Sequence, residues 1–245
     1  MRTHQAVLGW IEEQLSSQEL RLGSRLPGER AMAEQFGVSR TSVREALLVL
    51  EALGVVRSGV GSGPESGTFI TADPSVALDS SIRLHIASQQ ISVADVVGTR
   101  VLMEGWACAH ADPQAGSLDE AQTLLAAMDE VEASAADEFL DLDARFHYAL
   151  TRAAGNPLVS AIMASLRGSI RDYTAEIMSR QAGWPEIAQS LQKEHRGILH
   201  AVRQGDQPEA VRLVTGHIEG FHALARNAAP DDAAESAAGG RLQSH

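Results

Sequence analysis

Apolar residues recur at helical spacing along most of this chain. In the first part of the chain, the pattern predicts three short helices over residues 4–18, 29–36 and 39–53. Gly37 and Gly54 follow the second and third of these helices, at the position where a glycine commonly ends a helix. The apolar pattern therefore predicts a group of three helices at the N-terminal end.

A strand pattern follows these helices. The runs Val55–Arg57 and Thr68–Ile70 are short and rich in β-branched or aromatic residues, and a Gly-rich segment joins them. Three helices followed by one hairpin is the element order of a winged helix-turn-helix.

Beyond a linker at residues 71–74 the periodicity is helical. It predicts seven helices, near residues 75–89, 92–111, 118–133, 135–153, 157–181, 186–204 and 207–226. Ser117 and Ser134 are each followed by an acidic residue at about the spacing of a capping box, and Asn156 precedes a proline as an N-cap would. Seven helices with short loops favour an antiparallel all-α bundle.

These patterns predict a mainly α protein with two domains and a tail. Residues 1–73 are the expected winged helix-turn-helix, and residues 74–227 are the expected helical domain. Residues 228–245 are rich in Ala, Asp, Ser and Gly without any periodicity, so we expect this tail to be disordered.

Charge and composition indicate where the protein is located but do not decide its function. The chain carries a net charge of −12, but residues 1–72 hold seven basic and eight acidic residues and so contribute only −1 of it. A nearly neutral domain can still present a basic face to DNA phosphates. Cys108 is the one cysteine, and no leader or long apolar run is present. These features favour a cytoplasmic protein without a membrane segment.

Two arginines lie on one side of the third predicted helix. Arg40 and Arg44 are four residues apart, and Ser39 occupies the N-cap position that places Arg40 in the first turn. A recognition helix reads the major groove with such N-terminal residues, and an arginine fork suits guanine edges or phosphates. Arg30 could anchor the preceding helix to the DNA backbone. The alternative is that these arginines are surface charges paired with Glu29, Glu34 or Glu45.

The stretch LPGERAMAEQFGVSRTSVREALLVLEALGVV, followed by a wing that ends in SGTFI, resembles the DNA-binding domain of the GntR family. The resemblance covers nearly all of residues 6–71 and implies double-stranded operator DNA as a partner. It departs from the family at Ser42, where proline is frequent, and in a longer wing through Ser62–Glu65, with Gly63 near the tip. The contacts that it implies for DNA are Arg30, Ser39, Arg40, Thr41, Arg44 and Gly67.

The second candidate site combines a carboxylate with histidines. Asp143 and His147 are spaced i, i+4, which stacks two potential metal ligands on one helix face. His195 and His217 lie on two other amphipathic helices. Nitrogen and oxygen ligands of this kind suit Zn²⁺ or a similar divalent ion. From spacing alone, unrelated core or surface histidines remain the alternative.

Residues 92–226 resemble the FCD domain, the ligand-binding domain of the FadR subfamily within the GntR family. The matching pieces are TRVLMEGWAC, the Asp143–His147 pair, GNPLV and the helices of His195 and His217. The resemblance implies that these four residues bind a divalent metal, with Zn²⁺ the expected ion. It also implies a small carboxylate effector held by the metal and by Arg100, for which a buried pair with Glu104 is the alternative.

As a whole the chain resembles the L-lactate-responsive regulators of this family. The predicted function is a homodimeric repressor whose operator binding responds to a small carboxylate, with L-lactate as the first candidate. A sugar acid or the metal itself are alternative inputs. A metal-dependent hydrolase or oxygenase is the alternative from another class, but it requires a general base. Glu194 adjoins His195 yet points about 100° away on a helix, so we predict that the protein is not an enzyme.

Overall fold

A computed structural model of the chain describes residues 3–59, 66–71, 73–132, 135–179 and 183–228. Its contacts divide the chain into two compact units, Met1–Leu84 and His85–His245. The division falls within a helix that begins at Pro74. The domain limits expected at residues 73 and 227 therefore stay a prediction, and each unit is described separately below.

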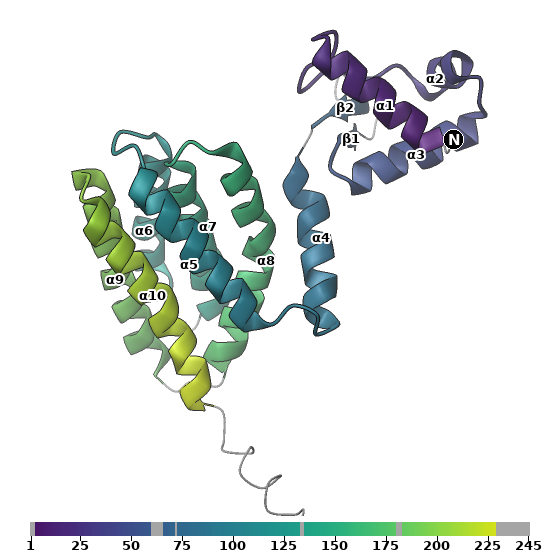
Figure 1. The fold of residues 1–245 in the computed structure, drawn as a ribbon. Coiled ribbons are helices and arrows are strands. Elements are labelled where there is room, and N and C mark those ends of the chain that lie inside the picture. Colours follow the sequence, from purple (N-terminus) through teal and green to yellow (C-terminus); the bar gives the residue numbers. More distant parts are fainter. Residues whose placement is uncertain (1–2, 60–65, 72, 133–134, 180–182, 229–245) are drawn as a thin grey trace, which may run out of the picture. The chain divides into compact units, whose positions relative to one another are not determined.

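The described part of the chain is mostly helical and contains one two-stranded sheet (Figure 1). Every helix and strand that the apolar pattern predicts is present, with ends that differ by a few residues at most. The elements are α1 (Thr3–Ser16), α2 (Glu29–Phe36), α3 (Arg40–Ala52), β1 (Val56–Gly59), β2 (Gly67–Ile70), α4 (Pro74–Ala87), α5 (Val93–His110), α6 (Ser117–Glu130), α7 (Ala136–Arg152), α8 (Pro157–Ser179), α9 (Trp184–Gln204) and α10 (Gln207–Ala228).

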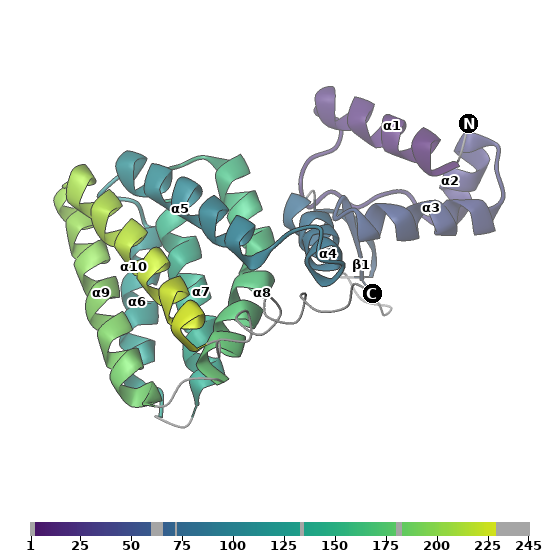
Figure 2. The same ribbon diagram turned by 60° about the horizontal axis from the view of Figure 1, so that its bottom comes forward.

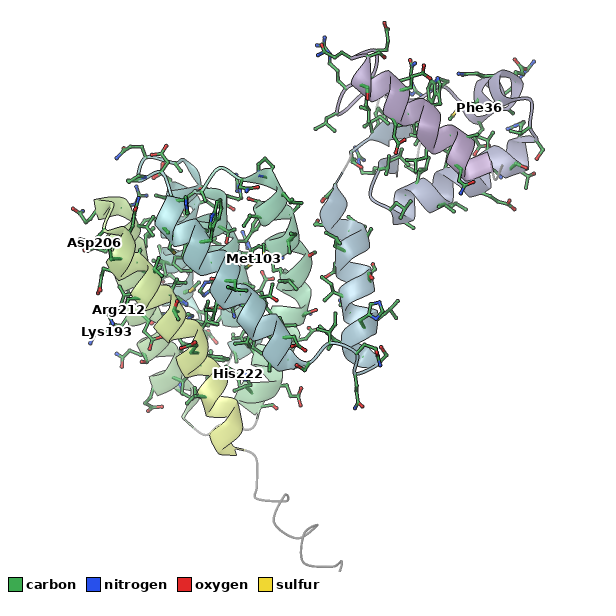
Figure 3. The ribbon with its side chains drawn as sticks, in the orientation of Figure 1. Phe36, Met103, Lys193, Asp206, Arg212 and His222 are labelled. Carbon is green, nitrogen blue, oxygen red and sulfur yellow. The ribbon has the colours of Figure 1, made fainter. Side chains whose placement is uncertain are left out.

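The first unit is a winged helix-turn-helix, as predicted. Helices α1 and α2 pack against α3, and β1 pairs antiparallel with β2 in a register that places Val56 opposite Ile70. Both of these strand residues join one apolar core with residues from all three helices. Trp10 and Phe36, the latter labelled in Figure 3, meet edge to face beside this core. The core residues with the least exposure are Val7, Ile11, Met32, Val43, Ala46, Leu50, Val56 and Ile70.

The turn between α2 and α3 is encoded locally. Gly37 ends α2 with a φ of 65°, a left-handed conformation that glycine adopts without a steric penalty. Two residues later the Ser39 hydroxyl accepts a hydrogen bond from the Ser42 amide at 3.0 Å and caps α3. The predicted helix stop and the predicted N-cap are both confirmed, and together they fix where the third helix begins.

The second unit is an all-α bundle, also as predicted. Helix α5 packs against α7, α8 and α10, while α6 packs against α7 and α9. Figures 1 and 2 show α9 and α10 side by side along the bundle. Phe139, Phe146, Ile198 and Ile218 are among its fully buried side chains. No helix within the described residues is both long and apolar enough to cross a membrane.

The helix starts were predicted only in part. Asn156 caps α8 by accepting hydrogen bonds from the amides of Leu158 and Val159, as expected. The capping box expected at Ser117 is wrong, because α6 begins at Ser117 itself and Gly116 takes the N-cap position. The box expected at Ser134 lies outside the described residues, as do the wing tip with Gly63 and the tail from residue 229.

A capping box that the sequence analysis missed starts α5. The Ser92 hydroxyl accepts a hydrogen bond from the Asp95 amide, and the Asp95 carboxylate accepts one from the Ser92 amide. This cap fixes the first turn of the helix that carries Arg100 and Glu104.

Candidate metal centre and nucleic-acid interface

Four predicted metal ligands from three helices meet inside the bundle. Asp143 and His147 extend from α7, His195 from α9 and His217 from α10, and all four side chains are buried. One potential ligand atom from each residue lies within 4.8 Å of the other three. The Nε2 atom of His217 is 3.1 Å from that of His147 and 3.2 Å from that of His195. A carboxylate oxygen of Asp143 is 3.0 Å from Nε2 of His195.

Two outer carboxylates determine which imidazole nitrogens face this centre. Nδ1 of His147 lies 2.5 Å from Glu104, and Nδ1 of His217 lies 2.7 Å from Glu194. Because an ionised carboxylate only accepts hydrogen bonds, both Nδ1 atoms carry the proton when the rings are neutral. The Nε2 lone pairs of His147 and His217 then point toward each other, an arrangement that favours a cation between them.

Electrostatics favour the same donor set. Burial lowers the pKa of His195, and burial together with the neighbouring His195 lowers the pKa of His217, so both rings tend to stay neutral. Burial alone would raise the pKa of Asp143, but the adjacent histidines outweigh it and lower that pKa. Neutral imidazoles and an ionised carboxylate are the forms that bind a divalent metal.

The spacing also fits one ion. Zinc binds imidazole nitrogen at about 2.0–2.1 Å, so two such nitrogens at angles between 90° and 109° are separated by about 2.9–3.4 Å. The separations of 3.1 and 3.2 Å between Nε2 atoms fall in this range. The four residues could therefore hold one divalent metal ion.

Arg100 lies beside this cluster, almost fully buried on α5. Its Nε donates to Glu104 at 2.8 Å, and its Nη1 donates to the hydroxyl of Tyr173 on α8 at 2.6 Å. The Arg100–Glu104 pair expected as an alternative is thus present. Although burial would raise the pKa of Glu104, Arg100 and His147 lower it to about 2. Nη2 of Arg100 has no hydrogen-bond partner among the described residues.

Three partners of the cluster were not predicted as such: Glu104 as the acceptor for His147, Tyr173 as the acceptor for Arg100, and Glu194 as the acceptor for His217. Glu194 adjoins His195 in the sequence, and its carboxylate accepts from Nδ1 of His217 on the next helix. These pairs join residues 43, 73 and 23 positions apart. No local spacing signals them.

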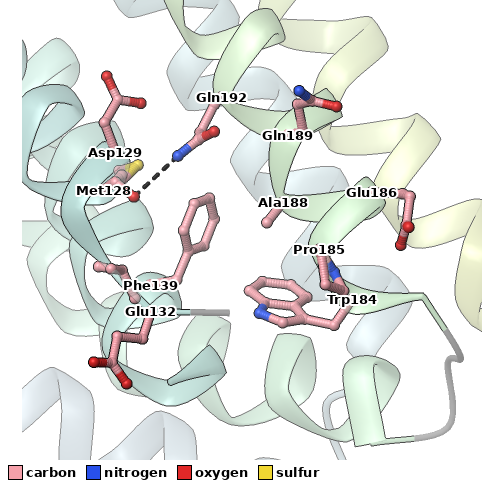
Figure 4. A pocket seen from close by; sticks show the side chains of 11 residues that line it. Met128, Asp129, Glu132, Phe139, Trp184, Pro185, Glu186, Ala188, Gln189 and Gln192 are labelled. Atoms are coloured by element: carbon pink, nitrogen blue, oxygen red, sulfur yellow. Dashed lines mark hydrogen bonds between the residues drawn. The ribbon is translucent and has the colours of Figure 1, made fainter. Parts of the chain in front are cut away.

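A surface pocket of about 340 Å³ lies one helical turn from the cluster (Figure 4). Phe139 lines it four residues before Asp143, and a hydrogen bond from the Gln192 side chain to the Met128 carbonyl crosses it at 2.9 Å. Its lining also includes three carboxylates, which repel an anion. A carboxylate effector is therefore not expected to bind there. These acidic residues are Asp129, Glu132 and Glu186.

The opposite faces of α9 and α10 differ sharply in polarity. Lys193 and Arg212 lie on the outer side of this helix pair, and both are exposed, as is Asp206 in the turn between the two helices (Figure 3). His195 and His217 lie on the inner side and are buried. The strongly amphipathic character of α9 and α10 therefore turns both histidines toward the bundle interior.

The predicted DNA-reading residues are exposed at the start of α3. Arg44 makes two hydrogen bonds to Glu29 at 2.9 and 2.8 Å, and Arg40 approaches the same carboxylate at 3.9 Å. Ser39 and Thr41 are exposed in the same turn. The pairing of Arg44 with Glu29 was the expected alternative. Such an exposed pair contributes at most about 1 kcal/mol, so a DNA phosphate or base can compete for the guanidinium.

Two further predicted contacts have protein partners. Arg30 on α2 pairs with Glu34 at 3.0 Å and is highly exposed. Gly67 starts β2 with a φ of 124°, and a Cβ placed there would lie 2.6 Å from Nε of Arg25. Any larger residue at this position would displace the Arg25 side chain. Glycine at position 67 thus has a structural role in the wing, beside any contact with DNA.

Two sequence profiles cover most of the chain. The profile of "Bacterial regulatory proteins, gntR family" matches residues 3–65, and that of the FCD domain matches residues 95–220, just over half of the chain. The first match covers the three helices and β1 of the winged helix-turn-helix, and the second covers the part of the bundle that carries the histidine cluster.

Curated relatives agree over nearly the whole length. The "Putative HTH-type transcriptional regulator RmpR" of Mycobacterium gastri is 30% identical over 219 residues, covering 87% of this chain and 76% of the relative. The "Putative L-lactate dehydrogenase operon regulatory protein" of Escherichia coli K12 is 26% identical, covering 89% and 84%. The "HTH-type transcriptional repressor NanR" of Salmonella newport is 28% identical, covering 88% and 84%.

The fold agrees with a solved structure as well. The structure described as Streptococcus agalactiae GntR superposes with a TM-score of 0.65 at 22% identity, covering 92% of this chain and 98% of that one. With the profile matches and the 30% identical relative, the assignment is plain. The chain belongs to the gntR family of bacterial regulatory proteins and is a DNA-binding transcription regulator, not an enzyme, with an FCD effector-binding domain.

Proposed function

We propose that this regulator is a metal-dependent repressor whose operator affinity is controlled by a small carboxylate, with L-lactate as the first candidate. One observation carries the proposal. The three imidazoles and the Asp143 carboxylate form a buried donor set for a cation, and the neighbouring Arg100 has a buried Nη2 with no hydrogen-bond partner among the described residues. A cation and a guanidinium together attract a carboxylate.

The metal would be held by Asp143, His147, His195 and His217, whose nitrogen and oxygen donors suit Zn²⁺. A bound divalent ion would supply a Lewis-acidic centre, and an ion that takes more than these four protein ligands would accept an oxygen from outside the protein. Glu104 and Glu194 orient two of the imidazoles through Nδ1, which is the outer-shell arrangement common in metal sites. Arg100 offers Nη2 to the effector while Nε and Nη1 remain bonded within the protein.

On the DNA side, we propose a homodimer that binds a near-palindromic operator with its two-fold axis aligned to that of the site. The contacts would come from the exposed residues at the start of α3, from α2 and from the wing. On binding, Arg40 and Arg44 would break their ion pairs with Glu29 and contact DNA instead. The complete set comprises Arg30, Ser39, Arg40, Thr41, Arg44 and the backbone of Gly67.

Lactate and repression are supported by likeness to named relatives. One similar protein is named for an L-lactate dehydrogenase operon, and another is named a repressor. The effector would act by binding two arrangements of the protein unequally, which for typical effectors corresponds to about 1–3 kcal/mol of coupling. L-lactate is then expected to weaken operator binding.

The proposal is tested by thermal unfolding of the full chain, either loaded with Zn²⁺ or treated with chelator. L-lactate, a sugar acid such as gluconate, and propionate are each added to both forms. A ligand that binds only the native state raises the unfolding temperature by mass action. We expect L-lactate to raise it in the zinc-loaded form alone. An equal shift in the chelated form, or no shift with any of the acids, would contradict a metal-dependent carboxylate site.

A further inference from the structure

Helix α8 has two buried polar side chains one turn apart, and one of them contacts Arg100. Tyr173 is 7% exposed, and its hydroxyl accepts the hydrogen bond from Nη1 of Arg100. Ser169 lies one helical turn earlier on the same face and is also 7% exposed. Its Oγ has no hydrogen-bond partner among the described residues, like Nη2 of Arg100. Two buried polar atoms therefore lack partners among the described residues, on two helices that the Arg100–Tyr173 hydrogen bond joins.

The donors and acceptors at this face can be counted. A guanidinium only donates, so the Tyr173 oxygen is the acceptor, and no described residue accepts the hydrogen of its hydroxyl. The Ser169 hydroxyl can both donate and accept. A buried polar group without a partner lowers stability by about 1–3 kcal/mol, so such groups commonly face a ligand or ordered water. The site therefore offers three groups that can donate a hydrogen bond: Nη2 of Arg100 and the hydroxyls of Tyr173 and Ser169.

The charges of the buried groups limit the charge of the ligand that can bind beside these donors. A divalent metal ion and Arg100 would contribute three positive charges, while the buried Asp143 and Glu104 contribute two negative ones. Glu194 also bonds His217, but its side chain is 43% exposed and therefore screened by solvent. The balance of +1 among the buried groups is neutralised by a single carboxylate, whereas a dicarboxylate would leave an excess negative charge among them. The remaining donors then suit an uncharged oxygen on the same molecule.

We propose that Ser169 and Tyr173 are specificity-determining residues that contact the effector and select a small hydroxycarboxylate with one negative charge over the acid that lacks the hydroxyl. This inference rests on the proposed function, because it assigns partners within the same effector site. Arg100 and the metal would hold the carboxylate, and Ser169 and Tyr173 would bond the oxygens that remain. A site that bonds a ligand hydroxyl discriminates strongly against the analogue without it, since its own polar groups would then stay unpaired.

Two substitutions on α8 test the assignment, with a matched control on the same helix. Ser169→Ala removes a hydroxyl that bonds nothing within the described residues. Tyr173→Phe removes the second hydroxyl and also an acceptor for Arg100. The control is Ser165→Ala, because Ser165 is equally buried but its hydroxyl donates to the Ile162 carbonyl at 2.6 Å. Zinc content and unfolding temperature are measured first, to establish that each variant is folded and loaded.

Calorimetric titration of the zinc-loaded full chain with L-lactate and with propionate then gives the result. We expect Ser169→Ala to bind L-lactate about tenfold more weakly while its propionate affinity changes little. Tyr173→Phe also loses an acceptor for Arg100, so we expect it to weaken both acids but L-lactate more than propionate. Ser165→Ala should keep the preference of the wild type. Unchanged lactate affinity in the loaded Ser169→Ala and Tyr173→Phe variants would overturn this inference and leave the proposed function standing. Failure of the loaded wild type to bind either acid would overturn both.

Discussion

Replacing Arg100 with alanine should destabilise the helical unit as well as weaken effector binding. In the structure Nε of Arg100 donates to Glu104 at 2.8 Å, and the two side chains are 4% and 2% exposed. Without the guanidinium, the Glu104 carboxylate is buried with only a histidine beside it. Arg100→Ala, made to test effector binding, would therefore also disturb the Glu104 carboxylate that accepts the hydrogen bond from His147.

The burial of both side chains determines how much the free energy of unfolding falls. Removing one partner of a buried ion pair typically lowers the free energy of unfolding by about 3–5 kcal/mol, because the other charge stays buried without compensation. The exposed Arg152–Glu120 pair is a matched control, with 42% and 44% exposed side chains at 2.6 Å. Its loss should cost at most about 1 kcal/mol. Adding Glu104→Gln to Arg100→Ala removes the stranded charge and should recover part of the loss.

Cys108 provides the assay, since it is the one cysteine of the chain and lies on the same helix as Arg100. In chelated full-length protein, alkylation of this buried thiol requires local opening, so its rate reports the stability of the unit. A loss of 3–5 kcal/mol corresponds to acceleration by roughly two to three and a half orders of magnitude. A rate for Arg100→Ala no faster than that of Arg152→Ala, or no slowing by Glu104→Gln, would refute the reasoning.

Three further outcomes are expected. Arg40→Ala and Arg44→Ala should each weaken specific operator binding by about 1–3 kcal/mol in gel-shift titration, and unchanged affinity would remove them from the contact set. Burial raises the pKa of Cys108 to about 12, so iodoacetamide at neutral pH should label native protein far more slowly than urea-unfolded protein. Equal rates would contradict a buried thiol. Light scattering should give a dimer both free and on DNA, and a monomer in both states would exclude the proposed assembly.

Features encoded within a few residues could be predicted from the sequence. Gly37 and Ser39 specify a helix end and a helix start by their own backbone chemistry, and both are found where expected. Ser117 shows the limit of this reasoning. Its hydroxyl is buried and has no partner in the described part of the chain, and it does not cap α6 because Gly116 takes the N-cap position. A capping signal thus depends on where the chain enters the helix, which packing decides.

In the candidate site too, contacts within one helix could be predicted from the sequence and contacts between helices could not. The i, i+4 pair of Asp143 and His147 is visible in the sequence because one helix face brings both together. Their meeting with His195 and His217 was implied by family resemblance, since spacing within single helices says nothing about how helices pack. Tyr173 carried no signal at all, because its partner Arg100 lies 73 residues away. Tertiary packing alone brings it to Arg100.

The central claim, that a metal-bound hydroxycarboxylate controls DNA binding, is tested most directly by fluorescence anisotropy. The probe is a labelled duplex that the protein itself selects from a random-sequence library. Wild type and His195→Ala, each with Zn²⁺ or with chelator, are titrated with L-lactate at fixed salt. The account predicts that L-lactate weakens binding of the zinc-loaded wild type by about 5- to 150-fold and leaves the other three samples unchanged. Equal responses with and without metal, or a full response in His195→Ala, would contradict it.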